Sequence, residues 1–280
     1  MTAASVASLI ADGARALAGG AVNASLEAQL LLAHVLAVSR AQLHSHPEAT
    51  ADTAQAAGYR QLLERRAAGE PLAYLTGRRE FWSLDLGVTP AVLIPRPETE
   101  LLVERALALG PPSAAHAADL GTGSGAIALA LARERPLWRI VATDVSAPAL
   151  AVARANAAAL GATAIEFLAG SWFGPLAGAR FDLLVSNPPY VAADDPALAS
   201  AALAFEPAVA LTPPGGDALG ALRILARGAA PHLLPGGWLL LEHGASQGPE
   251  VRAELVAAGF AHVRSHRDLA GHERTTEGRR

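Results

Sequence analysis

Residues 117–132 read Ala-Ala-Asp-Leu-Gly-Thr-Gly-Ser-Gly-Ala-Ile-Ala-Leu-Ala-Leu-Ala, and this stretch decides the fold class. A short apolar strand meets three glycines, Gly121, Gly123 and Gly125, and an apolar run with helical spacing follows them. Glycine tolerates a positive φ and lets backbone N–H groups approach a ligand closely at a helix N-terminus. The stretch therefore predicts a strand, a ligand-binding loop and a helix, the opening unit of an α/β sheet.

The same alternation continues along the chain. From about residue 96, short apolar strands alternate with longer helices rich in Ala and Leu, as in a doubly wound parallel sheet. Ligands bind such sheets beyond the carboxyl ends of the strands. One cleft can therefore hold Gly121, Asp144, Trp172 and Asn187, which all follow strand ends. We predict strands near residues 116–120, 139–143, 164–168, 181–186, 236–242, 259–265 and 272–278.

The glycine loop alone leaves the cofactor open. The spacing Gly121-x-Gly123-x-x-Ala126 also satisfies the dinucleotide-binding fingerprint. Asp144, at the end of the next strand, can bind ribose hydroxyls in either case. A third element is needed to separate a nicotinamide enzyme from one that uses S-adenosyl-L-methionine.

That third element is Asn187-Pro188-Pro189-Tyr190, which ends the strand predicted at 181–186. An amide nitrogen is a poor nucleophile because its lone pair is delocalised. The Asn187 carboxamide oxygen and the Pro188 carbonyl can each accept one N–H, and both bonds strengthen as positive charge grows on the nitrogen. Tyr190 offers a flat wall for stacking. The pattern indicates methyl transfer to a planar nitrogen; the alternative is a plain Asn-Pro turn.

Further blocks lie outside these two elements: Gly69-Glu-Pro-Leu-Ala-Tyr-Leu-Thr-Gly77, Arg79-Glu-Phe-Trp-Ser83, Leu93-Ile-Pro-Arg-Pro-Glu-Thr-Glu100, Phe205-Glu-Pro207 and Leu241-Glu-His-Gly244. With the glycine loop and Ser186-Asn-Pro-Pro-Tyr190, they resemble the protein-(glutamine-N5) methyltransferases of the HemK/PrmC type. The resemblance runs from about Gly69 to near the C-terminus. It is specific, because the block at residues 94–100 is not expected in a DNA adenine methyltransferase.

The resemblance implies a seven-stranded, Rossmann-like class I methyltransferase sheet whose last strand is antiparallel. It also implies methyl transfer from S-adenosyl-L-methionine to the glutamine of the Gly-Gly-Gln motif in class 1 peptide chain release factors, with S-adenosyl-L-homocysteine as co-product. The family often has Ser-Asp-Trp where this chain reads Gly170-Ser171-Trp172, so an acidic contact to the adenine amino group is absent from the sequence.

The expected site combines both lines of reasoning. We expect Asn187, Pro188 and Tyr190 to be catalytic, and these three with Pro189 to bind the substrate. Glu206, Glu242 and His243 stay outside the expected site, because the mechanism needs no general base. The expected cofactor-binding residues are Asp119, Gly121, Thr122, Gly123, Ser124, Gly125, Asp144, Trp172 and Asn187.

Three regions are expected along the chain. Residues 1–75 carry helical patterning over Ala3–Leu17, Ser25–Val38 and Ala51–Ala68 and are expected to form a small substrate-recognition domain. Residues 76–95 are expected to form a β-hairpin linker around Gly87. Residues 96–280 are expected to form the methyltransferase domain, with a loop at 195–220 that contains a short helix at Pro196–Ala204.

Composition narrows the class of protein. The 280 residues include no Cys and 9 scattered His, so we expect no disulfide and no metal site. A formal net charge of −4 argues against direct binding of nucleic acid, which depends on neutralising phosphates. No apolar run suits a membrane span and no signal peptide is evident, so a cytoplasmic protein is expected.

Other functions remain open from the sequence. The related activities are glutamine methylation of a ribosomal protein and N6-adenine methylation of nucleic acid. A non-catalytic S-adenosylmethionine-binding module is a further alternative, against which the intact Asn187–Tyr190 tetrapeptide argues.

Overall fold

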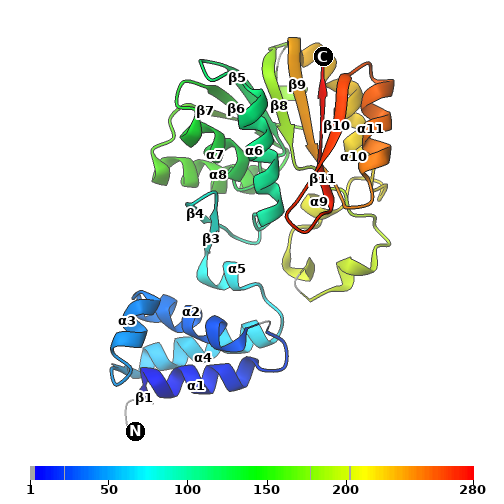
Figure 1. Cartoon of the computed structure of the whole chain (residues 1–280). Helices are drawn as coiled ribbons and strands as arrows, with labels where there is room; N and C mark the ends of the chain where they lie inside the picture. The colour runs from blue at the N-terminus through cyan, green and yellow to red at the C-terminus, as the bar shows by residue number, and fades with distance from the viewer. Residues whose placement is uncertain (1–3, 22, 177, 202) are drawn as a thin grey trace. The chain divides into compact units, whose positions relative to one another are not determined.

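The chain folds as two compact units, and the computed structural model describes residues 4–21, 23–176, 178–201 and 203–280 (Figure 1). One unit comprises the residues up to Gly77 together with Ala199–Phe205. The other comprises Arg78–Leu198 and Glu206–Arg280. None of the described helices is long and apolar enough to cross a membrane.

The N-terminal unit is helical. Its first four helices begin at side-chain caps, with Ser5, Asn23, Ser39 and Asp52 each accepting a backbone N–H. Ala3, where the first helix was predicted to begin, lies outside the described residues. The short helices at Arg40–Ser45 and Leu72–Thr76 were not predicted. The elements are β1 (Ala4–Ser5), α1 (Val6–Leu17), α2 (Ala24–Leu36), α3 (Arg40–Ser45), β2 (Thr50–Ala51), α4 (Thr53–Ala67) and α5 (Leu72–Thr76).

Tyr59 on α4 holds the first helices together. Its side chain is buried, and its hydroxyl donates to the backbone carbonyls of Leu9 on α1 and Ala28 on α2. A Cβ at Gly13 would come within 2.0 Å of this hydroxyl, so the close approach of the helices requires glycine there.

A β-hairpin follows, but its turn differs from the prediction. The strands are β3 (Arg78–Phe81) and β4 (Leu84–Gly87), and the turn is at Trp82-Ser83, not at Gly87. Both turn residues have a positive φ, 52° and 54°. Carboxylates hold this conformation: the Trp82 amide donates to Glu100 and the Ser83 amide donates to Glu80. Because the Glu100 and Glu80 carboxylates fix the turn at Trp82-Ser83, Gly87 did not indicate its position.

The second unit contains a sheet of seven strands in the order β10-β11-β9-β8-β5-β6-β7 (Figure 1). The strands β7, β6, β5, β8 and β9 are parallel, and β11 pairs antiparallel with both β9 and β10, as predicted. The strand order reverses between β5 and β8, the switch point where such sheets bind ligands. The strands are β5 (His116–Leu120), β6 (Arg139–Asp144), β7 (Ile165–Ala169), β8 (Phe181–Ser186), β9 (Leu233–Glu242), β10 (Ala261–Arg267) and β11 (Glu273–Arg279).

Helices cover both faces of this sheet (Figure 1). Alternate strand residues enter two separate cores, with Leu183 and Val185 in one and Leu184 in the other. The first core includes α6 (Glu100–Leu109), α7 (Ala126–Glu134) and α8 (Ala147–Leu160), and the second includes α10 (Gly220–Gly228) and α11 (Gly248–Ala257).

The remaining connections contain short turns of 3-10 helix. The helix predicted at Pro196–Ala204 is instead two such turns, η3 (Pro196–Ala199) and η4 (Leu203–Phe205), with residue 202 outside the described part. The other short elements are η1 (Pro97–Thr99), η2 (Gly174–Leu176), α9 (Ala208–Leu211) and η5 (Ala230–His232).

Candidate functional site

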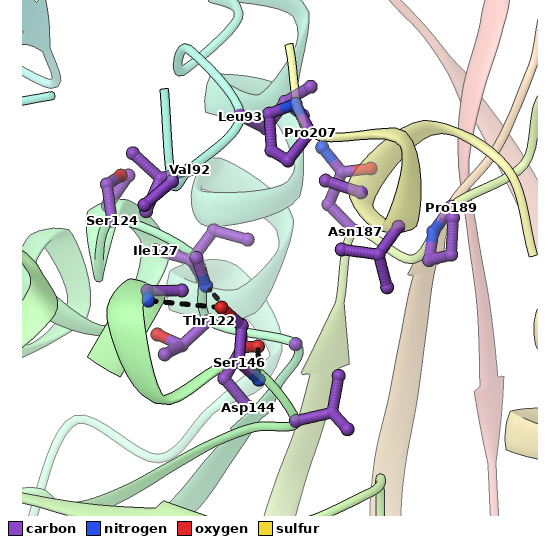
Figure 2. A pocket seen from close by; sticks show the side chains of 18 of the residues that line it. Val92, Leu93, Thr122, Ser124, Ile127, Asp144, Ser146, Asn187, Pro189 and Pro207 are labelled. Carbon is purple, nitrogen blue, oxygen red and sulfur yellow. Dashed lines mark hydrogen bonds between the residues drawn. The ribbon is translucent and has the colours of Figure 1, made fainter. Parts of the chain in front are cut away.

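A cavity of about 260 Å³ lies at the carboxyl ends of β5, β6 and β8. Figure 2 shows the side chains of Thr122, Asp144, Asn187 and Pro207 around it. Four predicted residues do not line it: Asp119, Gly125, Pro188 and Tyr190. The predicted residues that do line it are Gly121, Thr122, Gly123, Ser124, Asp144, Trp172, Asn187 and Pro189.

The glycine loop forms one wall of the cavity. Gly121 and Gly123 have φ values of 79° and 56°, which favour glycine. A Cβ at Gly121 would lie 3.3 Å from the Trp172 ring, whereas one at Gly123 would meet nothing within 4 Å. Backbone amides of Gly121 and Thr122 both donate to the Thr143 carbonyl, at 2.8 and 2.9 Å. The loop is therefore fixed, open to the cavity at Gly123 and covered by Trp172 at Gly121.

Two polar side chains brace this loop from neighbouring elements. Asp144 accepts the Gly123 amide at Oδ2 and the Ser146 amide at Oδ1, both at 2.8 Å. Asn156 on α8 donates to the Ser124 carbonyl at 2.9 Å and exchanges two further hydrogen bonds with the backbone of Gly87. The helix, the hairpin and the loop are thus connected through one amide side chain that sequence reasoning did not single out.

Asp119 lies beneath the loop and is fully buried. Burial raises the pKa of Asp119 to about 7, against the effect of a 2.6 Å hydrogen bond from the Thr122 hydroxyl. Its Oδ1 has no hydrogen-bond partner among the described side chains and backbone groups. Because Asp119 does not line the cavity, what the structure shows for it is support of the loop through Thr122.

Asn187 stands at the end of β8, with its side chain in the cavity lining. Its amide nitrogen donates to the Thr99 hydroxyl oxygen at 3.1 Å. Within the described chain, nothing donates to Asn187 Oδ1, so this oxygen keeps its acceptor capacity. The hydroxyl of the preceding Ser186 donates to the Leu120 carbonyl at 2.6 Å, which fixes the end of β8 to the end of β5. The Asn187 Oδ1 atom is therefore a hydrogen-bond acceptor held in a fixed position in the cavity that the glycine loop also lines.

Tyr190 does not line the cavity, and its hydroxyl and its carbonyl both form hydrogen bonds. Its hydroxyl donates to Glu242 Oε1 at 3.2 Å, and its carbonyl accepts from Gln247 Nε2 at 3.0 Å. Burial raises the pKa of Glu242 to about 7, while the hydrogen bond from the Tyr190 hydroxyl opposes this shift. Glu242 and Thr99 were outside the predicted site; their only sequence signal was their place in the blocks at 241–244 and 93–100.

Glu206 fastens the loop before α6. Its buried carboxylate accepts the Ile94 amide at 3.1 Å and forms an ion pair with Arg96. Pro97 occupies the first turn of η1, as suits a helix start. The block at 93–100 is thus held in place by several anchors, and Thr99 at its end faces Asn187.

The site fits an adenosyl cofactor. A glycine loop at the N-terminus of α7, a carboxylate after the next strand and an aromatic ring over the loop supply backbone amides, an acceptor and a stacking surface for such a ligand. Asn187 adds an acceptor that dinucleotide binding does not require.

Comparisons with known proteins agree with this geometry. Residues 8–77 match the family model described as the PrmC N-terminal domain, and residues 97–241 match the methyltransferase small domain. A release factor glutamine methyltransferase of Xylella fastidiosa (strain Temecula1) is 52% identical over 255 residues, which cover 91% of this chain and 92% of that protein. The chain belongs to the release factor glutamine methyltransferase family.

Other members show the same breadth of match. The protein of the same name from Burkholderia pseudomallei is 50% identical, over 91% of this chain and 92% of its own length. The one from Vibrio cholerae is 45% identical, over 92% of this chain and 91% of its own. These matches confirm the family that the sequence blocks resembled.

Solved structures agree on the fold. A methyltransferase from Pyrococcus furiosus superposes with a TM-score of 0.54 at 17% identity, covering 70% of this chain and 88% of that one. A 16S rRNA N2 methyltransferase from T. thermophilus, solved with AdoMet and guanosine, gives 0.50 at 20% identity, over 72% of this chain and 49% of that one. The predicted class I methyltransferase fold is confirmed.

Proposed function

We propose that this enzyme methylates the side-chain amide nitrogen (N5) of the glutamine in the Gly-Gly-Gln motif of class 1 peptide chain release factors. The methyl donor is S-adenosyl-L-methionine and the co-product is S-adenosyl-L-homocysteine. The observation that carries the proposal is the position of Asn187: its oxygen is free to accept, its nitrogen is bound to Thr99, and it lines the cavity that the glycine loop borders. Relatives up to 52% identical carry the corresponding name.

The cofactor site uses residues from three strand ends. The glycine loop lies against the cofactor with its backbone, Asp144 accepts ribose hydroxyls, and the Trp172 ring packs on the adenine. Asp119 does not line the cavity and supports the cofactor loop from beneath by accepting the Thr122 hydroxyl. Gly125 is the N-cap of α7 with a φ of 84°, and an added Cβ would lie 3.3 Å from Ala153, so its role is to let the loop turn into the helix. When bound, S-adenosylmethionine supplies an electrophilic methyl group on a sulfonium centre.

The substrate groups follow from the acceptors after β8. Asn187 Oδ1 accepts one N–H of the glutamine amide and the Pro188 carbonyl accepts the other, which orients the nitrogen toward the methyl group. Both hydrogen bonds strengthen as positive charge develops on nitrogen, so they stabilise the transition state more than the ground state. The alkylated amide is acidic and loses its proton to water without a general base. Pro189 forms the adjoining wall, and Tyr190 supports the loop through Glu242.

The N-terminal unit is proposed to read the protein substrate. A glutamine at the tip of a loop offers few contacts, so binding energy from other parts of the release factor must position it. Because the substrate acts in translation termination, the enzyme works in the cytoplasm, and a protein partner fits the negative formal charge of −4.

The direct test is mass spectrometry of the tryptic peptide that contains Gly-Gly-Gln, after incubation of a release factor with enzyme and S-adenosylmethionine. A single added methyl on the glutamine is expected, and none on a release factor whose glutamine is replaced by alanine. Methylation of a different residue, or of a ribosomal protein in preference to the release factor, would contradict the proposal.

A further inference from the structure

The loop Asn187–Tyr190 has little conformational freedom of its own. Pro188 and Pro189 have a fixed φ and no backbone N–H, so they cannot donate hydrogen bonds within the loop. A residue that precedes a proline is restricted to extended conformations, and this applies to both Asn187 and Pro188. The direction of the Pro188 carbonyl therefore depends on how the two ends of the loop are fixed.

The end at Tyr190 is fixed by three hydrogen bonds. The Tyr190 hydroxyl donates to Glu242 at 3.2 Å, and the amide of Val191 donates to the Leu211 carbonyl at 2.9 Å. The third bond runs from Gln247 Nε2 to the Tyr190 carbonyl, at 3.0 Å. Unlike the bond from the phenol, it acts on the main chain of Tyr190 and not on its side chain.

Gln247 can hold this carbonyl in only one orientation of its amide. It directly precedes α11, but its side chain makes no cap at the start of that helix. Instead its Oε1 accepts the Gly244 amide at 2.8 Å, while its Nε2 donates to the Tyr190 carbonyl. A backbone N–H can only donate and a backbone carbonyl can only accept, so a flipped amide would face both partners wrongly.

The turn from Gly244 to Gln247 has a fixed base. The Gly244 carbonyl accepts the Gln247 amide and His243 Nδ1, each at 2.9 Å, so Nδ1 carries a proton. His243 is fully buried, and burial lowers its pKa and favours the neutral ring. Its Nε2 therefore accepts from the Thr276 hydroxyl at 2.8 Å.

Thr276 extends this chain of hydrogen bonds to α11. Its proton points at His243, so its oxygen accepts the Ser265 hydroxyl at 2.7 Å. The Ser265 oxygen accepts in turn from Arg252. Each bond in the chain has one direction, and Gly244 is held by groups from the end of β9, from β11 and β10, and from α11.

We propose that Gln247 is a positioning residue for methyl transfer, which connects this fixed turn to the main chain of Tyr190 and so sets the direction of the Pro188 carbonyl. Gln247 does not line the cavity, so it acts on the substrate nitrogen only through the loop. The kinetic part of the inference rests on the proposed function, in which the Pro188 carbonyl accepts one N–H of the substrate amide. The hold on Tyr190 is a property of the enzyme alone.

The first test separates the two hydrogen bonds of the Gln247 side chain. Gln247→Glu keeps an acceptor for the Gly244 amide but has no N–H for the Tyr190 carbonyl, whereas Gln247→Met removes both. With a Gly-Gly-Gln peptide, kcat is expected to fall roughly 10- to 100-fold in both variants, the scale of a displaced reacting group. Affinity for S-adenosylmethionine, from isothermal titration, should stay within a few-fold. Near wild-type kcat in Gln247→Glu would mean that Gln247 supports only the turn, and it would overturn the proposal.

Ser246→Glu is the matched control for Gln247→Glu. Ser246 is exposed, and the change adds the same charge one residue farther from α11 while Gln247 stays in place. A carboxylate near a helix N-terminus is stabilising, so neither change should weaken α11. Ser246→Glu should keep wild-type kcat. An equal fall of kcat in the two variants would trace the effect to charge and overturn the proposal.

The second test needs no substrate. Because the Val191 amide donates to the Leu211 carbonyl, its hydrogen exchange reports how firmly this end of the loop is held. Exchange at Val191 is expected to be about tenfold faster or more in Gln247→Glu and Gln247→Met, and unchanged in Ser246→Glu.

The amide of Gly121, which donates to the Thr143 carbonyl in the glycine loop, should keep its exchange rate in all three variants. Unchanged exchange at Val191 in both Gln247 variants would overturn the proposal, even if the release factor proves not to be the substrate. If the wild type does not methylate Gly-Gly-Gln but Val191 responds to the Gln247 variants, only the proposed function is refuted.

Discussion

The backbone amide of Gly123 donates a 2.8 Å hydrogen bond to Oδ2 of Asp144, which stands at the end of the neighbouring strand β6. The other carboxylate oxygen accepts the Ser146 amide. Asp144 therefore does two things at once: it braces the glycine loop from outside, and it keeps lone pairs available toward the cavity that it lines.

Asp144→Ala is expected to weaken S-adenosylmethionine binding by about 1.5–3 kcal/mol, because it removes a charged acceptor and the brace of Gly123 together. Isothermal titration measures the loss. Asp182→Ala is the matched control: Asp182 also accepts a backbone amide at 2.8 Å, from His116, but at the amino ends of the strands. Equal effects of the two changes would show that Asp144 acts only through the fold, and micromolar binding of NAD by the wild type would overturn the cofactor assignment.

Asn187→Ala is expected to lower methyl transfer about a hundredfold or more, since one oriented hydrogen bond to developing charge contributes roughly 3 kcal/mol. Cofactor binding should stay within a few-fold of wild type. Asn187→Asp should also be impaired, because it lacks the NH2 group that donates to Thr99. Single-turnover rates at saturating cofactor measure both, and near-normal rates in the two variants would refute the acceptor mechanism.

Stability should depend on pH through Glu242. Its folded-state pKa of about 7 lies above the ordinary value of 4.5, so the folded state favours the neutral form. Its contribution is complete below about pH 4.5 and is lost as the pH rises through about 7. Glu242→Gln, which is always neutral, should gain up to about 3 kcal/mol relative to wild type between those limits. Urea unfolding at several pH values measures the gain, and a difference that stays constant across pH would contradict the expected titration.

Removal of residues 1–72 is expected to reduce kcat/KM on an intact release factor by roughly a hundredfold, through loss of remote binding energy. The rate on a short Gly-Gly-Gln peptide should remain within a few-fold. Because Ala199–Phe205 belongs to the N-terminal unit, the variant should also carry a Gly/Ser replacement of that segment. Cofactor titration serves as the control for folding. An equal loss on peptide and protein would make the unit a structural appendage.

The parts of the fold that follow local patterns could be predicted. β5, the glycine loop and the start of α7 follow from apolar runs and glycines that are adjacent in sequence. The hairpin turn could not be placed, because Trp82 and Ser83 take a positive φ only with Glu100 and Glu80 as acceptors. The environment of Asn187 was equally hidden, since Thr99, which accepts its side-chain amide, is 88 residues away in sequence.

The segment Ala199–Phe205 belongs to the helical unit although it lies within the catalytic half of the sequence. This affects how chimeras between members of the family can be built. A Cβ built at Gly69 would lie 2.7 Å from the Cβ of Ala201, so the returning segment packs closely against the end of the helical region. Residues 8–77, which match the N-terminal family model, therefore do not make up the whole helical unit. A chimera made by exchanging it at Gly77 would pair one parent's helices with the other parent's returning segment. Under the proposed role of the helical unit in substrate reading, we expect transfer of substrate preference between relatives to need two crossover sites, the second of them within the catalytic half of the gene.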